Sequence, residues 1–229
     1  MTKIPLILIV DDEAPIRSFL RTSLTTRGYA SEEAATAEMG LTLAASLNPD
    51  LILLDLGLPD LDGQEVVLRL RQTSQVPVII ISARAQEAEK VRALEAGADD
   101  YVSKPFGVEE LAARIKAALR RRTTPIHTGE TPQAFGDLLW DIGARRVFLS
   151  GSEVHLTPVE YRLLTVLASN PGRILTHRRL LEEVWGLKSG EFLHYVRIAM
   201  VGLRKKLEKD PGAPHFIHTE AGTGYRFFE

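Results

Sequence analysis

The 229-residue sequence has no cysteine, no long apolar run and no large excess of either charge. Without cysteine, a disulfide framework and cysteine-based metal or redox chemistry are excluded. No apolar run is long enough to span a bilayer, so we expect no membrane partner. The apolar run 6–10 leads directly into acidic residues, which excludes a signal peptide. We therefore expect a cytoplasmic protein.

The net charge of −2 conceals one local cluster of basic residues. Within residues 197–209, only Glu208 opposes the basic side chains of Arg197, Arg204, Lys205, Lys206 and Lys209. Such clustering is typical of proteins that bind nucleic acid.

Residues 1–121 alternate apolar runs with helical patterns, which predicts an α/β domain. The predicted strands are 4–10, 29–34, 50–55, 76–82 and 99–103, and the predicted helices are 14–27, 36–47, 64–72, 86–96 and 108–121. Five such units predict a parallel sheet with right-handed crossovers and helices on both faces. The polar run inside 29–34 makes that strand a candidate for the sheet edge. A flavodoxin-like (βα)5 order, 2-1-3-4-5, is the arrangement we expect.

Polar side chains stand where these strands end. Asp11 and Asp12 follow the first strand, Asp55 the third, Ser82 the fourth and Lys104 the fifth. In the expected order the first and third strands are neighbours, so the three carboxylates converge. Clustered carboxylates repel one another unless a cation joins them, and oxygen ligands suit Mg²⁺. The pattern predicts aspartyl phosphorylation with Lys104 and Ser82 assisting, and a cation site without chemistry is the alternative.

The motifs VDDE (10–13), LDLGLPDLDG (54–63), ISA (81–83) and GADDYVSKPF (97–106) resemble a response-regulator receiver domain. The resemblance implies that Asp55 accepts the phosphoryl group. It also implies Mg²⁺ ligands, namely Asp11, Asp12, Asp55 and the backbone carbonyl of Gly57. Ser82 and Lys104 are implied to bind the phosphoryl oxygens, and the Lys104–Pro105 peptide bond is implied to be cis.

Tyr101 resembles the aromatic switch residue of that family. When Ser82 moves toward a phosphoryl group, the ring is expected to turn inward, and a static half-buried tyrosine is the alternative. Phosphorylation adds about −1.5 to −2 charge to an acidic site, and the response is a population shift between two packings.

The resemblance also implies a dimer face on the last two helices and the last strand. The expected interchain pairs are Lys90 with Glu110, Asp100 with Arg114 and Asp99 with Arg121, around an apolar patch of Val91, Leu94 and Ala112. Exposed pairs each contribute about 1 kcal/mol or less, so a solvated charged surface is the alternative. Several pairs around an apolar centre favour a two-fold dimer.

Residues 122–133 are polar and rich in proline and threonine, which predicts a linker. Beyond it, in 134–229, short strands are predicted at 138–142, 146–149 and 154–156. Thr157-Pro158-Val159-Glu160 is a capping box that begins a helix. A second helix is predicted at 177–185 and a third at 191–209. A terminal hairpin around Gly222-Thr223-Gly224 completes an α+β winged helix-turn-helix.

The predicted third helix has two distinct faces. Val196, Met200, Leu203 and Leu207 form an apolar stripe. The opposite face carries the residues that we expect to contact DNA, which are His194, Arg197, Val201, Arg204 and Lys205. A helix of this kind fits the major groove, and a basic solvated surface helix is the alternative.

The second half resembles the winged-helix effector domain of OmpR/PhoB-type regulators through LTPVEYRLL (156–164), LLEEVWG (180–186), LRKKLE (203–208) and GTGYRF (222–227). Ala221 departs from that pattern because an arginine commonly stands there, so Thr223 and backbone groups are the expected wing contacts. The whole chain most resembles the KdpE branch, regulators of potassium-transport operons. The resemblance implies a sensor histidine kinase, promoter DNA and RNA polymerase as partners.

We therefore predict a phosphorylation-dependent transcriptional regulator that dimerises through its receiver. An aspartyl-phosphate phosphatase is one alternative, but such enzymes typically have an acid/base carboxylate where Gly57 stands. A constitutive DNA binder with a scaffolding receiver is the other.

Overall fold

The computed structural model describes residues 4–84, 86–123, 132–187 and 192–228. The chain forms two compact units, Met1–Thr123 and Thr124–Glu229, and each is described by itself. The division falls inside the predicted linker 122–133. The last residue of that predicted linker, Gln133, already belongs to a strand of the second unit.

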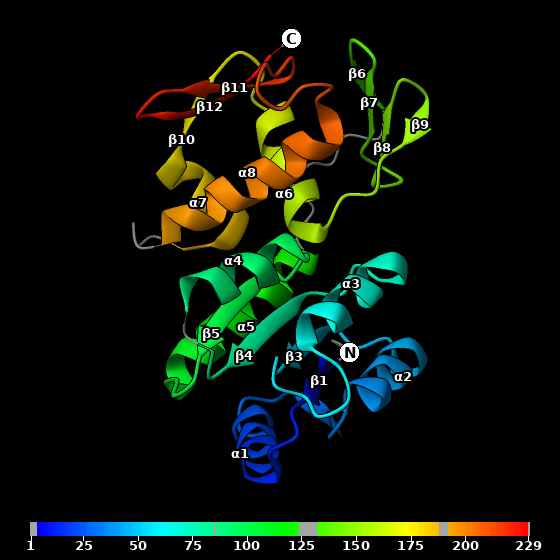
Figure 1. Ribbon diagram of the computed structural model, residues 1–229, viewed down its shortest axis with the longest axis vertical. Coiled ribbons are helices and arrows are strands. Elements are labelled where there is room, and N and C mark those ends of the chain that lie inside the picture. The colour runs from blue at the N-terminus through cyan, green and yellow to red at the C-terminus, as the bar shows by residue number, and fades with distance from the viewer. Residues whose placement is uncertain (1–3, 85, 124–131, 188–191, 229) are drawn as a thin grey trace. The chain divides into compact units, whose positions relative to one another are not determined.

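The first unit is a five-stranded parallel sheet in the order β2-β1-β3-β4-β5 (Figure 1), which confirms the predicted topology. Its strands are β1 Leu6–Val10, β2 Ala30–Ala34, β3 Leu51–Leu54, β4 Val78–Ser82 and β5 Asp100–Ser103. Its helices are α1 Ala14–Thr25, α2 Ala37–Leu47, α3 Gly63–Thr73, α4 Glu87–Glu95 and α5 Val108–Thr123. The register pairs Val10 with both Ala34 and Leu54, so the ends of β1 and β3 lie side by side.

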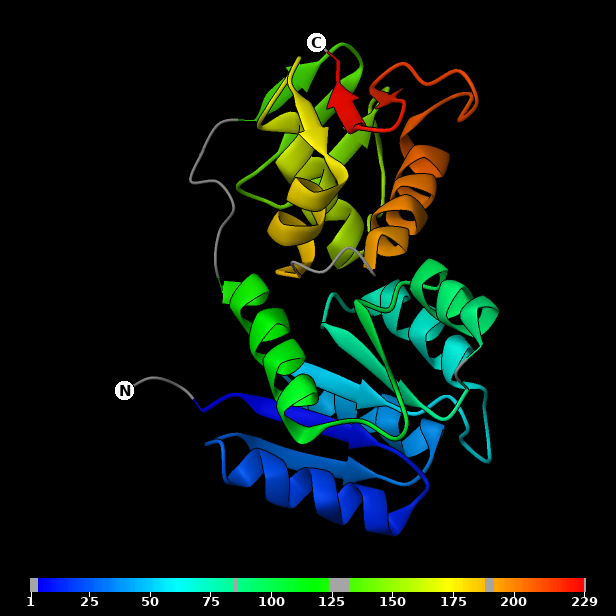
Figure 2. The ribbon, with the colours of Figure 1, turned by 90° about the vertical axis from the view of Figure 1, so that its left-hand side faces the viewer.

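Helices cover both faces of this sheet (Figure 2). Helices α1 and α5 pack on one core cluster through Leu20, Leu24 and Ile115. Helices α2, α3 and α4 pack on the other through Ala37, Val66 and Ala93. The central strands are therefore buried on both sides, which explains their continuous apolar sequence. Strand β2, ASEEA, lies at the edge of the sheet, as its polar run predicted, and its residues alternate in exposure.

The second unit begins with an antiparallel sheet in the order β6-β7-β8-β9. Its strands are β6 Gln133–Phe135, β7 Leu138–Asp141, β8 Arg146–Leu149 and β9 Ser152–Glu153. Helices α6 Pro158–Ala168, α7 His177–Trp185 and α8 Leu193–Leu207 follow, and a second sheet, β10-β12-β11, comprises Ile174–Thr176, Gly224–Phe227 and Ile217–Glu220. Both halves of the predicted capping box are formed, between Thr157 and Glu160.

One predicted strand of this unit is misplaced, and two of its strands were not predicted. The strand expected at 154–156 lies instead at Ser152–Glu153. Strands β6 and β10 were not predicted, because each has only three residues and is stabilised by pairing with a partner strand.

No helix in the described part of the chain is both long enough and apolar enough to cross a membrane.

Candidate functional site

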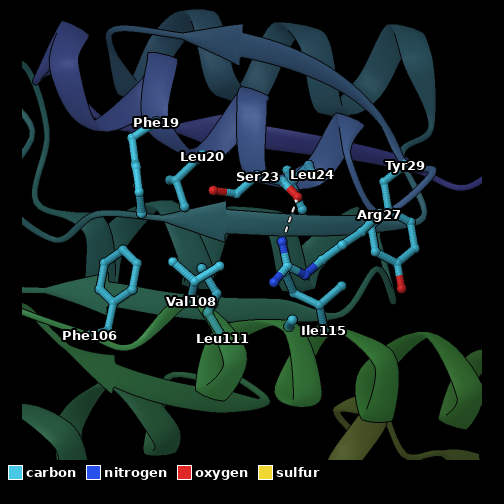
Figure 3. A pocket seen from close by; sticks show the side chains of 11 residues that line it. Phe19, Leu20, Ser23, Leu24, Arg27, Tyr29, Phe106, Val108, Leu111 and Ile115 are labelled. Atoms are coloured by element: carbon cyan, nitrogen blue, oxygen red, sulfur yellow. Dashed lines mark hydrogen bonds between the residues drawn. The ribbon is translucent and has the colours of Figure 1, made fainter.

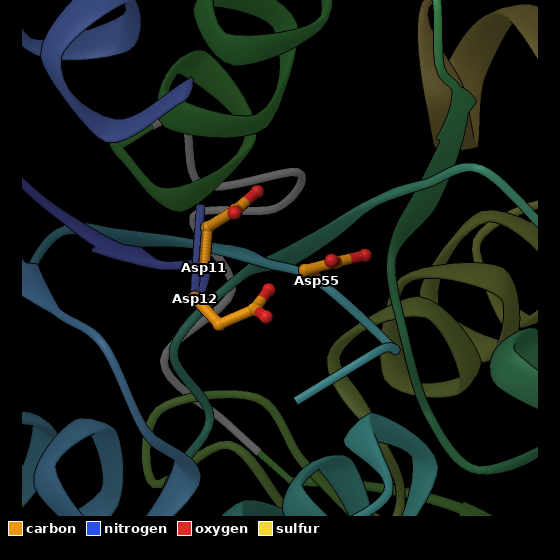
Figure 4. Close-up of side chains that lie close together, drawn as sticks. All are labelled: Asp11, Asp12 and Asp55. Carbon is orange, nitrogen blue, oxygen red and sulfur yellow. The ribbon is translucent and has the colours of Figure 1, made fainter. Parts of the chain in front are cut away.

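Three carboxylates converge at the carboxyl edge of the receiver sheet (Figure 4). Asp11 and Asp12 directly follow β1, and Asp55 directly follows the neighbouring strand β3. Each residue offers an oxygen, and these oxygens all lie within 4.8 Å of one another. Asp11 and Asp55 are only 2% and 7% exposed, whereas Asp12 faces solvent. The structure thus brings together the three acidic residues that the sequence singled out.

Lys104 is the cation of this cluster. It follows β5, and its Nζ lies 2.8 Å from Asp11 Oδ2 and 3.3 Å from Asp55 Oδ2. Burial alone lowers the pKa of Lys104, but the hydrogen bonds to Asp11 and Glu13 and the charge of Asp55 outweigh burial, so its pKa is raised. Burial raises the pKa of Asp11, although Lys104 opposes that shift. The ammonium group is therefore held in its charged form beside Asp55.

Glu13 was not predicted as part of this site. Its Oε1 lies 3.0 Å from Lys104 Nζ, so the lysine bridges three carboxylates rather than two. The available signal was the fourth residue of the VDDE motif, which follows the two aspartates.

The loop after β3 is held by two tight features. A side chain at Gly63 would place its Cβ only 2.6 Å from the carbonyl oxygen of Asp55, so glycine is required there. The carboxylate of Asp60 accepts the backbone N–H groups of Ala37 and Glu38 at 2.9 and 3.0 Å. Both hydrogen bonds lower the pKa of Asp60, and the one from Glu38 has the larger effect. The loop that carries exposed Gly57 is thereby fastened to the start of α2.

Ser82 and Tyr101 meet at the backbone of one residue. The Ser82 hydroxyl, at the end of β4, accepts the N–H of Arg84 at 3.2 Å. The Tyr101 hydroxyl donates to the carbonyl of Arg84. The Tyr101 ring is buried in the core cluster of α2, α3 and α4, and this burial raises the pKa of the phenol. In this conformation, therefore, the expected switch residue points inward.

Two aspartates predicted to make interchain pairs already have partners within the chain. Asp99, predicted to pair with Arg121, is 6% exposed and lies 2.8 Å from Arg71, and it also accepts the N–H of Val78. Asp100 is paired with Arg114 at 2.9 Å in the same chain. Each of these buried carboxylates is thus matched by an arginine of its own chain, and the interchain pairs remain predictions. The side chain of Arg121 lies outside the described part.

The other predicted members of the dimer face remain at or near the surface. Lys90, Val91 and Leu94 are half-buried on α4, and Glu110 is exposed on α5, where it pairs with Arg114 at 2.9 Å. Ala112 lines an apolar hollow between α1 and α5 together with Phe19, Phe106 and Leu111 (Figure 3). The predicted apolar patch of Ala112 with Val91 and Leu94 remains a prediction.

Helix α8 has the two faces that its sequence predicted. Val196, Met200, Leu203 and Leu207 are buried. On the outer face Arg197, Val201 and Lys205 are exposed at successive turns, and Val201 is 46% exposed. His194 is half-buried, with its ring 4.6 Å from the ring of Tyr195. The exposed outer face has one cation on each side of an apolar side chain. Such a face suits contact with a phosphate backbone and base edges.

Arg204, which was predicted to contact DNA, also has partners within the second unit. Its guanidinium donates to the carbonyl of Ile217 at 2.6 and 3.2 Å and to Thr219 Oγ1 at 2.9 Å. It also lies over the ring of Tyr225, 5.5 Å from the centroid. Arg204 therefore joins α8 to the terminal hairpin, and it is a positioning residue in this conformation. Thr223 is exposed at the tip of that hairpin, and so is Ala221, two residues before it.

The hairpin is also anchored through a buried carboxylate that sequence reasoning missed. Glu208, directly after α8, accepts the N–H groups of His215, Phe216 and Ile217 at 2.7 to 2.9 Å. It is 6% exposed. The sequence showed Glu208 only as the acid opposing a basic cluster, and its three donors became visible only in the folded chain.

Comparison with protein families accounts for both units. Residues 7–116 match the family described as "Response regulator receiver domain", and residues 151–227 match "Transcriptional regulatory protein, C terminal". Over 222 residues, 96% of this chain and 98% of its relative, the chain is 53% identical to "KDP operon transcriptional regulatory protein KdpE" of Escherichia coli K12. The chain belongs to the OmpR/PhoB-type response regulators.

Further comparisons agree with that assignment. "Transcriptional regulatory protein KdpE" of Mycobacterium tuberculosis H37Rv is 45% identical over 97% of this chain and 98% of its own. A solved structure of a RitR mutant has a TM-score of 0.83 with 28% identity, covering 98% of this chain and 99% of that one. The Thermotoga maritima OmpR/PhoB homolog DrrB has a TM-score of 0.52 with 32% identity, covering 99% and 100%.

Membership of the response-regulator family indicates a function for the two units. As a response regulator with a receiver and a DNA-binding domain, the chain has the architecture of phosphorylation-dependent transcription regulators, which work with a histidine kinase and with DNA. The relatives are transcriptional regulators rather than enzymes.

Proposed function

We propose that a partner histidine kinase phosphorylates Asp55 and that the modified chain binds promoter DNA as a dimer. The contact between Asp55 Oδ2 and Lys104 Nζ, 3.3 Å, carries the proposal. It pairs a nearly buried carboxylate nucleophile with a cation able to neutralise incoming phosphoryl oxygens. Its position at the end of a central parallel strand is where such sheets bind their ligands.

The transfer forms one bond and breaks one. A carboxylate oxygen of Asp55 attacks the phosphorus of a phosphohistidine, the P–N bond breaks, and its electron pair returns to the imidazole, which takes up a proton. The Lys104 ammonium and the Ser82 hydroxyl are the proposed partners of the phosphoryl oxygens. The backbone N–H of Leu56, 2.8 Å from Asp55 Oδ1, orients the nucleophile.

The three-carboxylate cluster fits Mg²⁺, since its oxygens approach one another within 4.8 Å and one of its members is exposed to solvent. We assign the ion to Asp11, Asp12, Asp55 and the carbonyl of Gly57. When bound, Mg²⁺ neutralises charge on the transferred group. Lys104 balances part of the acidic charge before any ion binds, and Glu13 gives the ammonium a further partner.

Dimerisation is proposed through the α4 and α5 surface, with Lys90 facing Glu110 of a second chain around Val91 and Leu94. Half-buried apolar side chains next to opposite charges support this face. Because Asp99 and Asp100 are satisfied internally, the apolar contact rather than these aspartates supplies the attraction. A two-fold arrangement places two copies of α8 on neighbouring half-sites, about one helical turn apart.

We further propose cytoplasmic action on a potassium-transport operon together with RNA polymerase. The resemblance to relatives called KdpE, one of them described by its KDP operon, supports this assignment. The exposed Arg197, Val201 and Lys205 of α8, with Thr223 at the hairpin tip, are the proposed DNA contacts.

The test is phosphorylation of the full chain by acetyl phosphate in Mg²⁺. We expect a mass increase of about 80 Da on Asp55, none on Asp55→Asn, and phosphate-dependent dimers by analytical ultracentrifugation. The phosphorylated chain should bind duplex DNA from upstream of a potassium-transport operon more tightly than Asp55→Asn. Absence of the adduct in the unmodified chain, or an equal adduct on the variant, contradicts the proposal.

A further inference from the structure

Glu13 stands at the N-cap position of α1, but its side chain does not cap that helix. The N-cap position favours short polar side chains that accept a hydrogen bond from the first turn of the helix. The Glu13 side chain makes no such bond, and its Oε1 lies instead 3.0 Å from Lys104 Nζ. This side chain therefore contacts the phosphorylation site rather than the helix that it precedes.

Carboxylates engage every N–H donor of the Lys104 side chain. An ammonium group carries three such donors. The Lys104 Nζ lies 2.8 Å from Asp11 Oδ2, 3.0 Å from Glu13 Oε1 and 3.3 Å from Asp55 Oδ2. A phosphoryl oxygen can therefore accept a hydrogen bond from Lys104 only when one of these carboxylates gives up its contact.

The three carboxylates differ in how easily they can leave Lys104. The side chains of Asp11 and Asp55 are 3% and 9% exposed, whereas that of Glu13 is 56% exposed. A buried carboxylate that loses its cation is left unpaired, but an exposed one is hydrated by water. Asp55 is also the proposed nucleophile, so it keeps its negative charge until its oxygen has bonded to phosphorus. Loss of the contact with Lys104 is therefore least costly at Glu13.

We propose that Glu13 is a positioning residue that competes with the phosphoryl group for Lys104. In the resting receiver it accepts one N–H of the ammonium group, and it turns into solvent when a phosphoryl oxygen approaches. Removal of its charge frees that donor, so Glu13 slows phosphorylation. An ion pair with one exposed partner shifts an equilibrium by about two- to fivefold, which sets the size of the effect. The inference rests on the proposed phosphorylation of Asp55.

The first experiment compares Glu13→Gln with a matched control. Glutamine keeps the length of the side chain and removes its charge, and the backbone N–H at this position still donates to Asp11 Oδ1, 2.9 Å away. Glu38→Gln is the control, because Glu38 is exposed in the first turn of α2, at the same edge of the sheet, and is not among the acceptors of Lys104. Full-length chains with Mg²⁺ are treated with acetyl phosphate or with phosphoramidate. The initial rate of adduct formation on Asp55 is measured by mass spectrometry.

We expect Glu13→Gln to react about two- to fivefold faster than the unmodified chain with both phosphodonors. Glu38→Gln should react at the rate of the unmodified chain. The two phosphodonors separate competition for Lys104 from repulsion at a distance, because phosphoramidate has a protonated nitrogen and carries less negative charge. An acceleration that is confined to acetyl phosphate, or that Glu38→Gln shares, assigns the effect to net charge and overturns the inference. An unchanged or slower rate for Glu13→Gln also overturns it.

The second experiment measures the contact between Glu13 and Lys104 without any phosphodonor. A double-mutant cycle combines Glu13→Gln with Lys104→Met in the full-length chain, and unfolding of the receiver is followed in urea. We expect the effects of the two substitutions on the unfolding equilibrium constant to be non-additive by about two- to fivefold. Additive effects overturn the inference. Failure of the proposed function is a different result, since it leaves this coupling intact while the unmodified chain shows no adduct on Asp55.

Discussion

The two units use charge in opposite ways. In the receiver, Asp11, Asp55 and Lys104 are largely withdrawn from water and satisfy one another at strand ends. In the second unit, Arg197 and Lys205 stand exposed on one helix. Withdrawn charges need partners and have fixed geometry, which phosphoryl transfer requires. Exposed cations remain available to phosphates, which supply much of the affinity for DNA.

Each unit also contains a buried carboxylate that takes no part in its proposed function. In the receiver, Asp99 joins Arg71 and the N–H of Val78. In the second unit, the Glu208 carboxylate accepts hydrogen bonds from three backbone N–H groups. Burial and acidity are thus shared by structural and reactive carboxylates. What separates Asp55 from them is a second carboxylate and a lysine within reach at the edge of the sheet.

The largest expected effect tests the structural carboxylate of the second unit. Glu208→Ala should lower the free energy of unfolding of that unit by about 3 kcal/mol, because it leaves three amides without their acceptor. The change is measured by denaturant unfolding, with the receiver transition as an internal reference.

The control for this substitution is Glu183→Ala. Glu183 pairs with Arg179 at 2.6 Å on exposed helix surface, and its removal should change stability by about 0.5 kcal/mol or less. Equal losses for the two variants would mean that the backbone contacts of Glu208 contribute little, and the comparison between buried and exposed carboxylates would fail.

The next effect separates exposed from internally bonded arginines on α8. Arg197→Gln should make the negative slope of log affinity against log salt shallower by about 0.9, because one phosphate contact is lost. Arg204→Gln should weaken DNA binding through displacement of the terminal hairpin while leaving that slope unchanged. Both are measured by fluorescence anisotropy with one promoter duplex over a salt series. A reduced slope for Arg204→Gln would return that residue to the DNA contacts.

The smallest effect concerns the exposed carboxylate that fastens the receiver loop. Hydrogen bonds from Glu38 and Ala37 lower the pKa of Asp60, so its ionised form is favoured in the folded state. Its contribution is present above the unfolded pKa of about 3.8 and is lost as pH falls through the lower folded value. Asp60→Asn should therefore be less stable than the unmodified chain at neutral pH, and the difference should shrink in acid. Thermal unfolding across pH measures it, and a difference independent of pH contradicts the assignment.

Much of the receiver was predictable because its signals are local. Apolar runs that end at Asp11, Asp55 and Ser82, and a shorter strand before Lys104, predicted both the sheet and the edge where these polar residues gather. The expected cis Lys104–Pro105 bond is present, and the capping box of α6 is formed as its spacing indicated. The short strands β6 and β10 escaped prediction because pairing with distant strands, rather than their own sequence, stabilises them.

The sequence by itself determined the order of the elements, the apolar stripe of α8 and the residue types at the strand ends, since periodicity and turn chemistry act over a few neighbouring positions. Only the tertiary structure decided which charge meets which. Asp99 joins Arg71, Arg204 joins the terminal hairpin and Glu13 joins Lys104 because these partners are distant in sequence and folding brings them together. A charged side chain reveals its chemistry in the sequence, but its role depends on the nearest group that folding places beside it.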